Sequence, residues 1–440
     1  MLNIFKPKFE EVKQFSLDNG LKIIILENHQ FPIVYVNLLF DRVLFSEGNK
    51  SGWKSIFGPM LRSGTKNRTK EEIDQNIEFL GTKFYASFDE MSISSLTRYL
   101  DESLSIMRDV LFNPIFNNTK EFEKIIGQKI VYLKINEKNP HTIAKRVKRV
   151  LYFGKNHPFG EIQTIESLNN IKIKDFDGFY RSYIEPNVAY LILIGDIDIE
   201  KAKKISEKYF YSFTFSPTFD KKYETPPLLS KTTIGLVDIP SVNQSTILVG
   251  NKVDFRKNTF DYLSAVLVNS ILGGGGQSRL FLNLREDKGY TYNVYSSLIP
   301  NKHISSFYVY TQVRSEVTAE AVKEIIKEFN KITSITVTSE ELQNYKKEKI
   351  GSFLLGLEDL SVRAKFTLDE LRYELPFGLH KNYLKSLQEI TSLDVKNAAN
   401  KYIPTENFWI LIVGDVNKIL PEVGQLGYPI FLLDELGNSI

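Results

Sequence analysis

The sequence predicts an α+β fold of two homologous α/β sandwich domains that form a clam-shell, each with an antiparallel-rich sheet and helices on one face. Two observations predict it. The chain has 440 residues, more than one domain usually holds. Its halves also share a strand-then-helix pattern and repeat at a constant offset (386 − 167 = 219). The repeated positions are Ser167-Leu168, Asp175 and Gly195-Asp196, which recur as Ser386-Leu387, Asp394 and Gly414-Asp415.

Composition narrows the function classes. The net charge of +3 gives no reason to expect nucleic acid as a partner. The one dense basic cluster, Lys145-Arg146-Val147-Lys148-Arg149, is interpreted as the solvated face of a helix. The absence of cysteine excludes disulfides, thiolate metal sites and cysteine nucleophiles. No apolar run reaches the ~20 residues of a transmembrane segment, and no signal peptide begins the chain. A cytoplasmic protein is expected, or a periplasmic one if the N-terminus results from processing.

The first domain is predicted to span residues 1–212. A strand pair turns at Asp18-Asn19-Gly20, and a capping box, Thr69-Lys70-Glu71-Glu72, begins a helix that ends at Gly81. A short buried helix covers 53–61, although Pro59 lacks the N–H that a helix interior needs. The remaining predicted elements are a strand at 33–40, a helix around 104–111, a long helix at 118–135 and a buried strand at 189–196.

The segment 213–231 is predicted to be a linker, because it is rich in Pro, Ser, Thr and Lys and shows no hydrophobic period. The second domain is predicted to span 232–440. Its expected elements are strands at 245–251 and 306–313, helices at 260–272 and 317–329, and a helical region from Thr338 to Pro376.

The stretch 271–298 connects these elements in the second domain. Four glycines, Gly273, Gly274, Gly275 and Gly276, end one helix and form a turn without side chains. Ser278 is the expected N-cap of the next helix, which ends at Gly289 before a strand at 292–296. Arg285 thus lies near a helix end and Tyr292 at a strand start, so both side chains can point into one space. The glycine pattern matches neither a dinucleotide fingerprint nor a Walker loop.

No complete catalytic constellation is found among the residues themselves. The five histidines include no H-E-x-x-H motif and no inverse H-x-x-E-H motif. His157, with Glu161 four residues later, is either half of a metal site or, as we favour, a structural histidine in a turn. No Gly-x-Ser-x-Gly elbow is present.

The stretch from Leu272 through Gly273–Gly276, Leu284-Arg285-Glu286 and Gly289-Tyr290-Thr291-Tyr292 resembles the signature of the second domain of the pitrilysin/insulinase family, in the mitochondrial processing peptidase branch. Further matches extend the resemblance over nearly the whole chain: Asn19-Gly20, Gly64-Thr65, Asn113-Pro114, His157-Pro158, Gly195-Asp196 and Gly414-Asp415. The resemblance implies two homologous α+β domains that clasp a peptide in a central chamber.

The chain departs from this family at the metal site. Active members carry H-x-x-E-H before a Gly-Thr pair. Aligned on Gly64-Thr65, Ser55 replaces the first His, Gly58 the Glu base and Pro59 the second His. Tyr132 stands at the third ligand, a Glu in active members. Zinc requires imidazole or carboxylate ligands and its water requires a base, so no metal site is expected in this chain.

The other part of the family's active site is retained. The resemblance implies that Arg285 and Tyr292 hold the substrate backbone and the developing oxyanion, a role suited to a guanidinium and a phenol. Without the resemblance, an Arg that caps its own helix and a core Tyr are the expected roles. Gly273–Gly276 also resemble, weakly, the substrate-binding glycine-rich loop of the non-catalytic processing-peptidase subunit; a plain turn is the favoured alternative.

The leading hypothesis is therefore a zinc-free subunit of a heteromeric metallopeptidase, inactive on its own. It pairs with a zinc-bearing homologous subunit, and the substrate is an unstructured peptide. Two alternatives remain: a structural protein like the respiratory-complex core proteins of the family, or a stand-alone peptide-binding homodimer without proteolysis.

Overall fold

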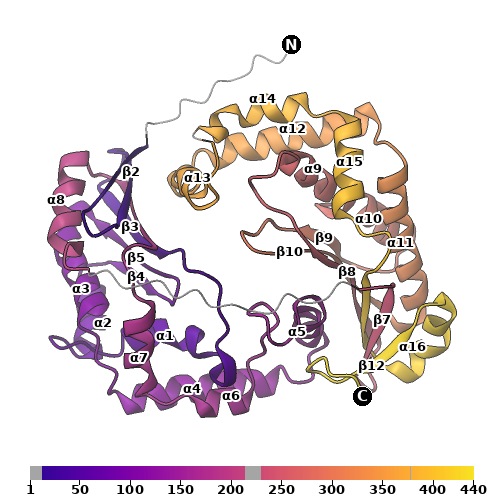
Figure 1. Cartoon of the computed structure of the whole chain (residues 1–440), viewed down its shortest axis with the longest axis horizontal. Coiled ribbons are helices and arrows are strands. Elements are labelled where there is room, and N and C mark those ends of the chain that lie inside the picture. Colours follow the sequence, from indigo (N-terminus) through magenta and orange to yellow (C-terminus); the bar gives the residue numbers. More distant parts are fainter. Residues whose placement is uncertain (1–11, 214–228, 377) are drawn as a thin grey trace. The chain divides into compact units, whose positions relative to one another are not determined.

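The computed structural model describes residues 12–213, 229–376 and 378–440, which contain two six-stranded sheets (Figure 1). Four of the five strand pairings in the first sheet are antiparallel, and three of the five in the second. The first sheet has the order β1 (Lys13–Ser16), β2 (Lys22–Glu27), β6 (Ala189–Gly195), β3 (Ile33–Phe40), β5 (Glu90–Leu96), β4 (Lys83–Ala86). The second has the order β12 (Ile430–Leu433), β7 (Thr233–Asp238), β11 (Trp409–Gly414), β8 (Gln244–Val253), β10 (Ser305–Arg314), β9 (Val294–Leu298).

Helices account for most of the remaining described residues. Those of the first half are α1 (Trp53–Leu61), α2 (Lys70–Phe79), α3 (Leu100–Phe112), α4 (Thr119–Ile135), α5 (Pro140–Phe153), α6 (Ile165–Asn170), α7 (Asp175–Tyr183) and α8 (Ile199–Phe210). Those of the second half are α9 (Tyr262–Gly273), α10 (Arg279–Phe281), the π-helical turn η3 (Leu282–Asp287), α11 (Thr318–Ser334), α12 (Ser339–Gly356), α13 (Leu360–Arg372), α14 (Tyr383–Glu389), α15 (Ser392–Tyr402) and α16 (Val416–Val423). Short 3₁₀ turns lie at Gly48–Lys50, Thr97–Tyr99, Ser315–Val317, Leu379–Asn382 and Gly424–Leu426. The predicted fold class is confirmed.

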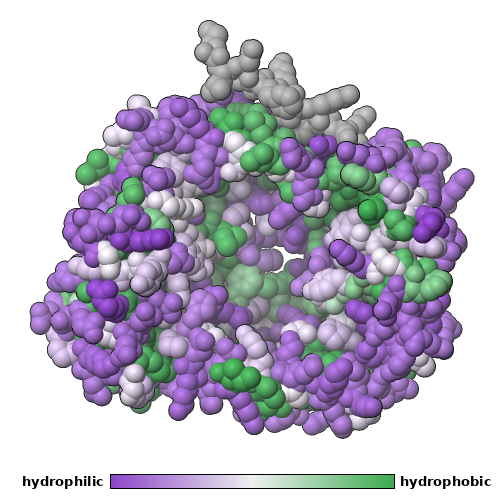
Figure 2. Space-filling view, turned by 180° about the vertical axis from the view of Figure 1, so that it is seen from behind, coloured by the Kyte–Doolittle hydropathy of each residue, from purple (hydrophilic) through white to green (hydrophobic). Residues whose placement is uncertain are grey.

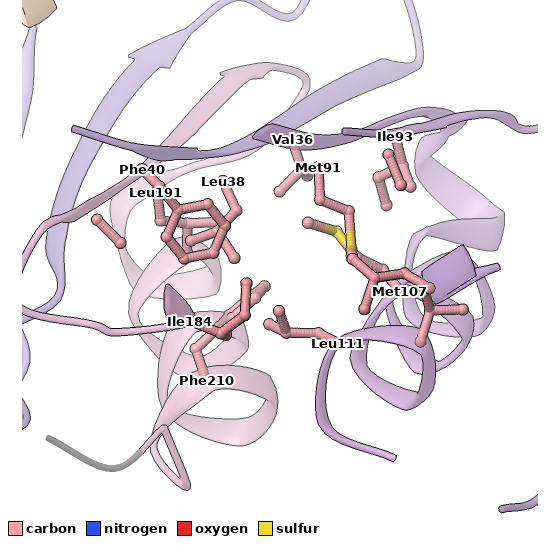
Figure 3. Packing of buried hydrophobic residues seen from close by; sticks show 14 of the residues in the cluster. Val36, Leu38, Phe40, Met91, Ile93, Met107, Leu111, Ile184, Leu191 and Phe210 are labelled. Atoms are coloured by element: carbon pink, nitrogen blue, oxygen red, sulfur yellow. The ribbon is translucent and has the colours of Figure 1, made fainter. Parts of the chain in front are cut away.

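The core of the first sheet follows the two-residue period of its strands. Val36 and Leu38 of β3 point toward α3, where Met107 and Leu111 meet them (Figure 3). Phe210 of α8 closes the same cluster. Each such buried side chain contributes about 1.5–3 kcal/mol to the free energy of unfolding. The sheet is therefore held mainly by the helices that cover this face.

The opposite face of each sheet carries one further helix. On the first sheet, Ile24 and Ile192 pack against Leu368 of α13. On the second, Leu411 and Val413 pack against Val147 of α5. Each sheet thus has the predicted helices on one face. In addition, α13 covers the other face of the first sheet and α5 the other face of the second.

The two covering helices are exchanged between the halves of the sequence. Helix α5 belongs by its contacts to the compact unit of the second sheet, and α13 to that of the first. Shifted by the offset of 219, the span of α5 becomes 359–372, which nearly coincides with α13. The chain passes between the units within α4 and within α12. Both halves of the repeat therefore contribute a helix at the same position to the sheet of the other half.

Several sequence-based boundaries differ from the structure. The strand expected at 292–296 begins at Val294, and the helical region from Thr338 is two helices separated at residues 357–359. Pro59 lies inside α1. The predicted linker 213–231 falls largely outside the described residues.

Hydrophilic side chains cover most of the surface seen in Figure 2, and apolar ones form small separate groups. Among the described helices, none is both long and apolar enough to cross a membrane.

Candidate functional site

The positions of the expected metal motif lie on α1. Ser55 and Pro59 are one turn apart and both exposed, and the Ser55 hydroxyl donates to the carbonyl of Gly52 at 2.8 Å. Gly58 is buried, and a Cβ there would lie 2.1 Å from the carbonyl oxygen of Ala86. No side chain fits at position 58 unless β4 moves, so the base of the motif is excluded by packing as well as by sequence.

The fourth position, Tyr132, lies on α4 with its side chain 59% exposed. A phenol, a hydroxyl and a proline ring do not form a zinc ligand set. Across residues 12–213, 229–376 and 378–440, no group of three or more His, Asp or Glu side chains is arranged to hold a metal ion. The residues present therefore do not fit zinc.

His157 has a structural role in its turn. It is 2% exposed, and its Nδ1 accepts a hydrogen bond from the backbone N–H of Phe159 at 3.1 Å. Its carbonyl accepts from the N–H of Glu161 at 3.0 Å. Burial, with His303 and Lys252 nearby, lowers the pKa of His157 to about 4, so the ring is neutral. These contacts agree with the favoured interpretation of a turn histidine.

The glycines at the end of α9 differ in what they do. A Cβ at Gly273 would lie 2.3 Å from the backbone nitrogen of Ser296, and one at Gly274 would lie 2.6 Å from the Cα of Ser270. A Cβ at Gly275 would meet nothing within 4 Å, and one at Gly276 only the ring of Phe281 at 3.8 Å. Packing of α9 against β9 therefore requires Gly273, and the close approach to the preceding turn of α9 requires Gly274. Gly275 and Gly276 are exposed and unconstrained.

The helix after the glycines is held by contacts with distant parts of the sequence. Ser278 occupies the N-cap position, but its hydroxyl donates to the carbonyl of Gly275 at 2.6 Å. Arg279 donates to both carboxylate oxygens of Glu341 on α12, at 2.9 and 2.7 Å. The Asn283 amide donates to Glu328 at 2.9 Å. These contacts anchor the π-helical turn, a kind of element that often occurs at functional sites.

Arg285 lies on this turn with its side chain 44% exposed. Its guanidinium is 4.6 Å from the ring centroid of Phe281, and its Nε is 3.5 Å from a carboxylate oxygen of Glu286. Neither contact ties the guanidinium to the carbonyls at its own helix end. Arg285 is therefore held beneath by an aromatic ring and remains accessible to a ligand.

Tyr292 lies at the other end of the turn and is 87% exposed, so it is not a core residue. Gly289 allows the turn with a φ of +60°. The buried Thr291 braces it: its hydroxyl donates to the carbonyl of Asn293 at 2.9 Å and accepts from the N–H of Asn293 at 3.1 Å. The structure thus presents Arg285 and Tyr292 on one short braced segment that leads into β9.

Sequence reasoning missed one polar cluster. Lys148 of α5 was expected on a solvated face, but it is partly buried, and its Nζ lies 3.6 Å from the ring centroid of Tyr308. The signal was helical spacing, because Ala144, Lys148 and Tyr152 fall on one face of α5. Lys145 is exposed, as expected.

Comparisons with known proteins agree with the fold. Residues 170–349 match the family described as "Peptidase M16 inactive domain". The chain is 25% identical over 413 residues to a protein of Helicobacter pylori named "Non-peptidase homolog YmxG", covering 90% of this chain and 92% of that protein. It is 24% identical over 421 residues to "Zinc protease PqqE" of the same organism, covering 90% and 91%.

Solved structures give the same picture. The structure described as a peptidase M16 inactive domain from Pseudomonas fluorescens has a TM-score of 0.83 at 24% identity, and the alignment covers 92% of this chain and 98% of that one. A protease from Helicobacter pylori has a TM-score of 0.77 at 22% identity, with 92% and 99% covered. These two likenesses concern the fold.

Proposed function

Since the chain belongs to the peptidase M16 family and is similar to one of its non-peptidase members, we propose that it is the zinc-free subunit of a heteromeric metallopeptidase. It pairs with a zinc-bearing homologue and contributes Arg285 and Tyr292 to that subunit's substrate. The observation that carries the proposal is a contrast: the metal positions hold no zinc ligand and Gly58 has no room for a side chain, while Arg285 and Tyr292 are exposed on a braced turn. A placement in the processing-peptidase branch stays a prediction.

The two retained side chains supply hydrogen-bond donors. A guanidinium and a phenol beside a scissile carbonyl stabilise the negative charge that develops on its oxygen. Phe281 limits the motion of the Arg285 guanidinium, so less conformational entropy is lost when a ligand binds. Hydrolysis itself takes place on the metal-bearing partner.

An extended peptide has a place to bind beside these residues. Strand β9 is the last strand of its sheet and pairs with β10 on one side. Such an edge offers backbone N–H and C=O groups to an added strand. Because Tyr292 lies two residues before β9, a peptide added to this edge passes close to the donor pair.

Similarity to two differently named proteins supports a pairing. One organism, Helicobacter pylori, has both a relative named as a zinc protease and a relative named as a non-peptidase homologue. A relative named as a protease and one named as a non-peptidase homologue thus come from the same organism, which a two-chain enzyme of this kind requires.

The test is a cleavage assay with a quenched peptide library and zinc. This chain, its zinc-motif homologue from the same genome, and the mixture of both are compared. We expect activity in the mixture, with kcat/KM reduced about 100-fold by Arg285→Ala and by Tyr292→Phe, the scale measured for loss of one oxyanion donor. Lys288→Ala, which removes a cation from the same turn, is the matched control and leaves activity unchanged.

Two results would contradict the proposal. Full activity of the homologue alone, unchanged on mixing, favours the structural or peptide-binding alternatives. Cleavage by this chain alone with bound zinc would contradict the assignment of Ser55, Gly58, Pro59 and Tyr132 as non-ligating.

A further inference from the structure

A lysine without a counterion lies on the second sheet. Helix α5 places the Lys148 side chain against β10, with its Nζ 3.6 Å from the ring centroid of Tyr308 and 5.9 Å from that of Tyr152. Among the described residues, no carboxylate pairs with this ammonium, and the charged groups nearest to it are the cations Lys145 and Arg149. A partly buried charge of this kind normally has an ionic partner.

A second polar group at the same place also lacks a partner. Tyr152 is 1% exposed, and within the described part of the chain its hydroxyl makes no hydrogen bond. A buried hydroxyl without a partner costs free energy, and such groups call for a specific explanation. Burial raises the pKa of Tyr152 well above its usual value, so the phenol keeps its proton and can donate it in a hydrogen bond.

The surroundings form a fixed aromatic wall. The rings of Tyr295 and Tyr310 stack with centroids 5.2 Å apart, and Tyr308 meets Tyr295 edge-on at 6.4 Å. The hydroxyl of Tyr310 is 2.6 Å from Nδ1 of His141. Burial lowers the pKa of His141, so this ring does not supply a competing cation at neutral pH. The wall leaves the ammonium and the Tyr152 phenol as the groups that require a ligand.

We propose that Lys148 and Tyr152, with the wall of Tyr295, Tyr308 and Tyr310, form a binding site for a carboxylate of the peptide substrate. An ammonium and a phenolic O–H are both donors, and the two oxygens of a carboxylate are the acceptors that such donors pair with. The inference rests on the proposed function, since it names the class of peptide that binds: one with an acidic side chain or a free C-terminus. Tyr295 lies on β9, so the site belongs to the same sheet edge as the donor pair.

The test measures binding to this chain alone, without zinc or a partner. Fluorescence anisotropy follows a labelled, unstructured peptide of about 20 residues, long enough to span several strand positions. Versions carry a central Glu or Gln, each with a free or an amidated C-terminus. We expect the peptides with a carboxylate to bind about tenfold more tightly than the peptide with none, as for a charge-assisted hydrogen bond. The separate versions show whether the side chain or the terminus is the source.

Variants then assign the effect to Lys148. In Lys148→Met the preference for a carboxylate disappears while the neutral peptide binds as before, and Lys148→Arg keeps part of the preference. Lys145→Met, an exposed lysine on the same helix, is the matched control and behaves like the wild type. The proposal is overturned if the wild type binds neutral and acidic peptides equally, if none of them binds, or if Lys148→Met keeps the preference. Because this experiment measures binding and not cleavage, its result can be interpreted even if the mixture of the two chains shows no peptidase activity.

Discussion

Gly58 shows at the scale of one residue why the metal motif is absent. Its Cα lies against the backbone at the end of β4, where a Cβ would meet the carbonyl oxygen and carbon of Ala86 at 2.1 and 2.5 Å. These are backbone atoms, which cannot move aside as a flexible side chain can. Restoring H-x-x-E-H by substitution in this chain therefore requires a shift of β4 relative to α1, and not only a change of side chains.

We predict that Gly58→Ala lowers the free energy of unfolding by about 2–3 kcal/mol, the cost of overpacking a close-packed interior. The matched control is Gly127→Ala on α4, where a Cβ meets nothing within 4 Å. That variant is expected to gain about 0.5–1 kcal/mol, because alanine loses less backbone entropy in a helix. Urea unfolding of both variants measures the difference, and equal stabilities would contradict the close approach of β4.

For Lys148 we predict the opposite effect: substitution of this residue stabilises the fold. Burial lowers the pKa of Lys148 to about 8, with Lys145 and Arg149 adding repulsion. At pH 7 the buried positive charge therefore lowers the free energy of unfolding. Lys148→Met removes the charge and keeps the packing of the aliphatic part of the side chain, so it is expected to raise the free energy of unfolding by about 1–3 kcal/mol.

The pH dependence tests the same cause. The unfolded lysine binds its proton up to its usual pKa of 10.5 and the folded one only to about 8, so the wild type regains stability as pH rises between these values. Tyr295, Tyr310 and His141 change little in this range, because burial raises the pKa of Tyr295 and of Tyr310 to about 12 and lowers that of His141. The advantage of Lys148→Met in urea unfolding should therefore shrink from pH 8 to 10, and a constant advantage would contradict the assignment.

At the scale of elements, the strands and helices could be predicted because their periods and caps are local. The capping box at Thr69 is an example: its hydroxyl accepts from the N–H of Glu72, and the Glu72 carboxylate accepts from the N–H of Thr69, at 3.2 and 2.8 Å. The π-helical turn could not be predicted in this way. The contacts that anchor it, from Arg279 to Glu341 and from Asn283 to Glu328, join residues far apart in the sequence.

The candidate site likewise has features that the local sequence predicts and features that depend on distant contacts. Position and spacing predict Arg285 near a helix end and Tyr292 at a strand start; in the structure Arg285 lies on the π-helical turn and Tyr292 lies two residues before β9. That Tyr292 is exposed, that Phe281 lies beneath Arg285 and that Lys148 lies on a tyrosine ring depend on neighbours from other elements. A basic run such as 145–149 has the same composition whether it is solvated or packed, so only the sheet that α5 covers decides the environment of Lys148.

At the scale of the whole molecule, the exchanged helices make each half of the sequence incomplete. The first sheet needs α13 from the second half to cover Ile24 and Ile192, and the second sheet needs α5 from the first half to cover Leu411 and Val413. Each uncovered apolar side chain forfeits about 1.5–3 kcal/mol. A half on its own therefore exposes apolar side chains that the full chain buries, which favours association with another polypeptide.

This predicts the behaviour of the two proposed domains, 1–212 and 232–440, produced as separate polypeptides. Each alone is expected to aggregate or to unfold without cooperativity. Produced together with a tag on one, they should co-purify in equal amounts, because each half then completes the core of the other. Leu368→Asp places a charge among the residues that α13 buries on the first sheet, so it should abolish the co-purification, whereas Leu355→Asp at an exposed position on α12 should not. Two halves that are each monomeric and cooperatively folded would show that the exchanged helices are not needed for either sheet.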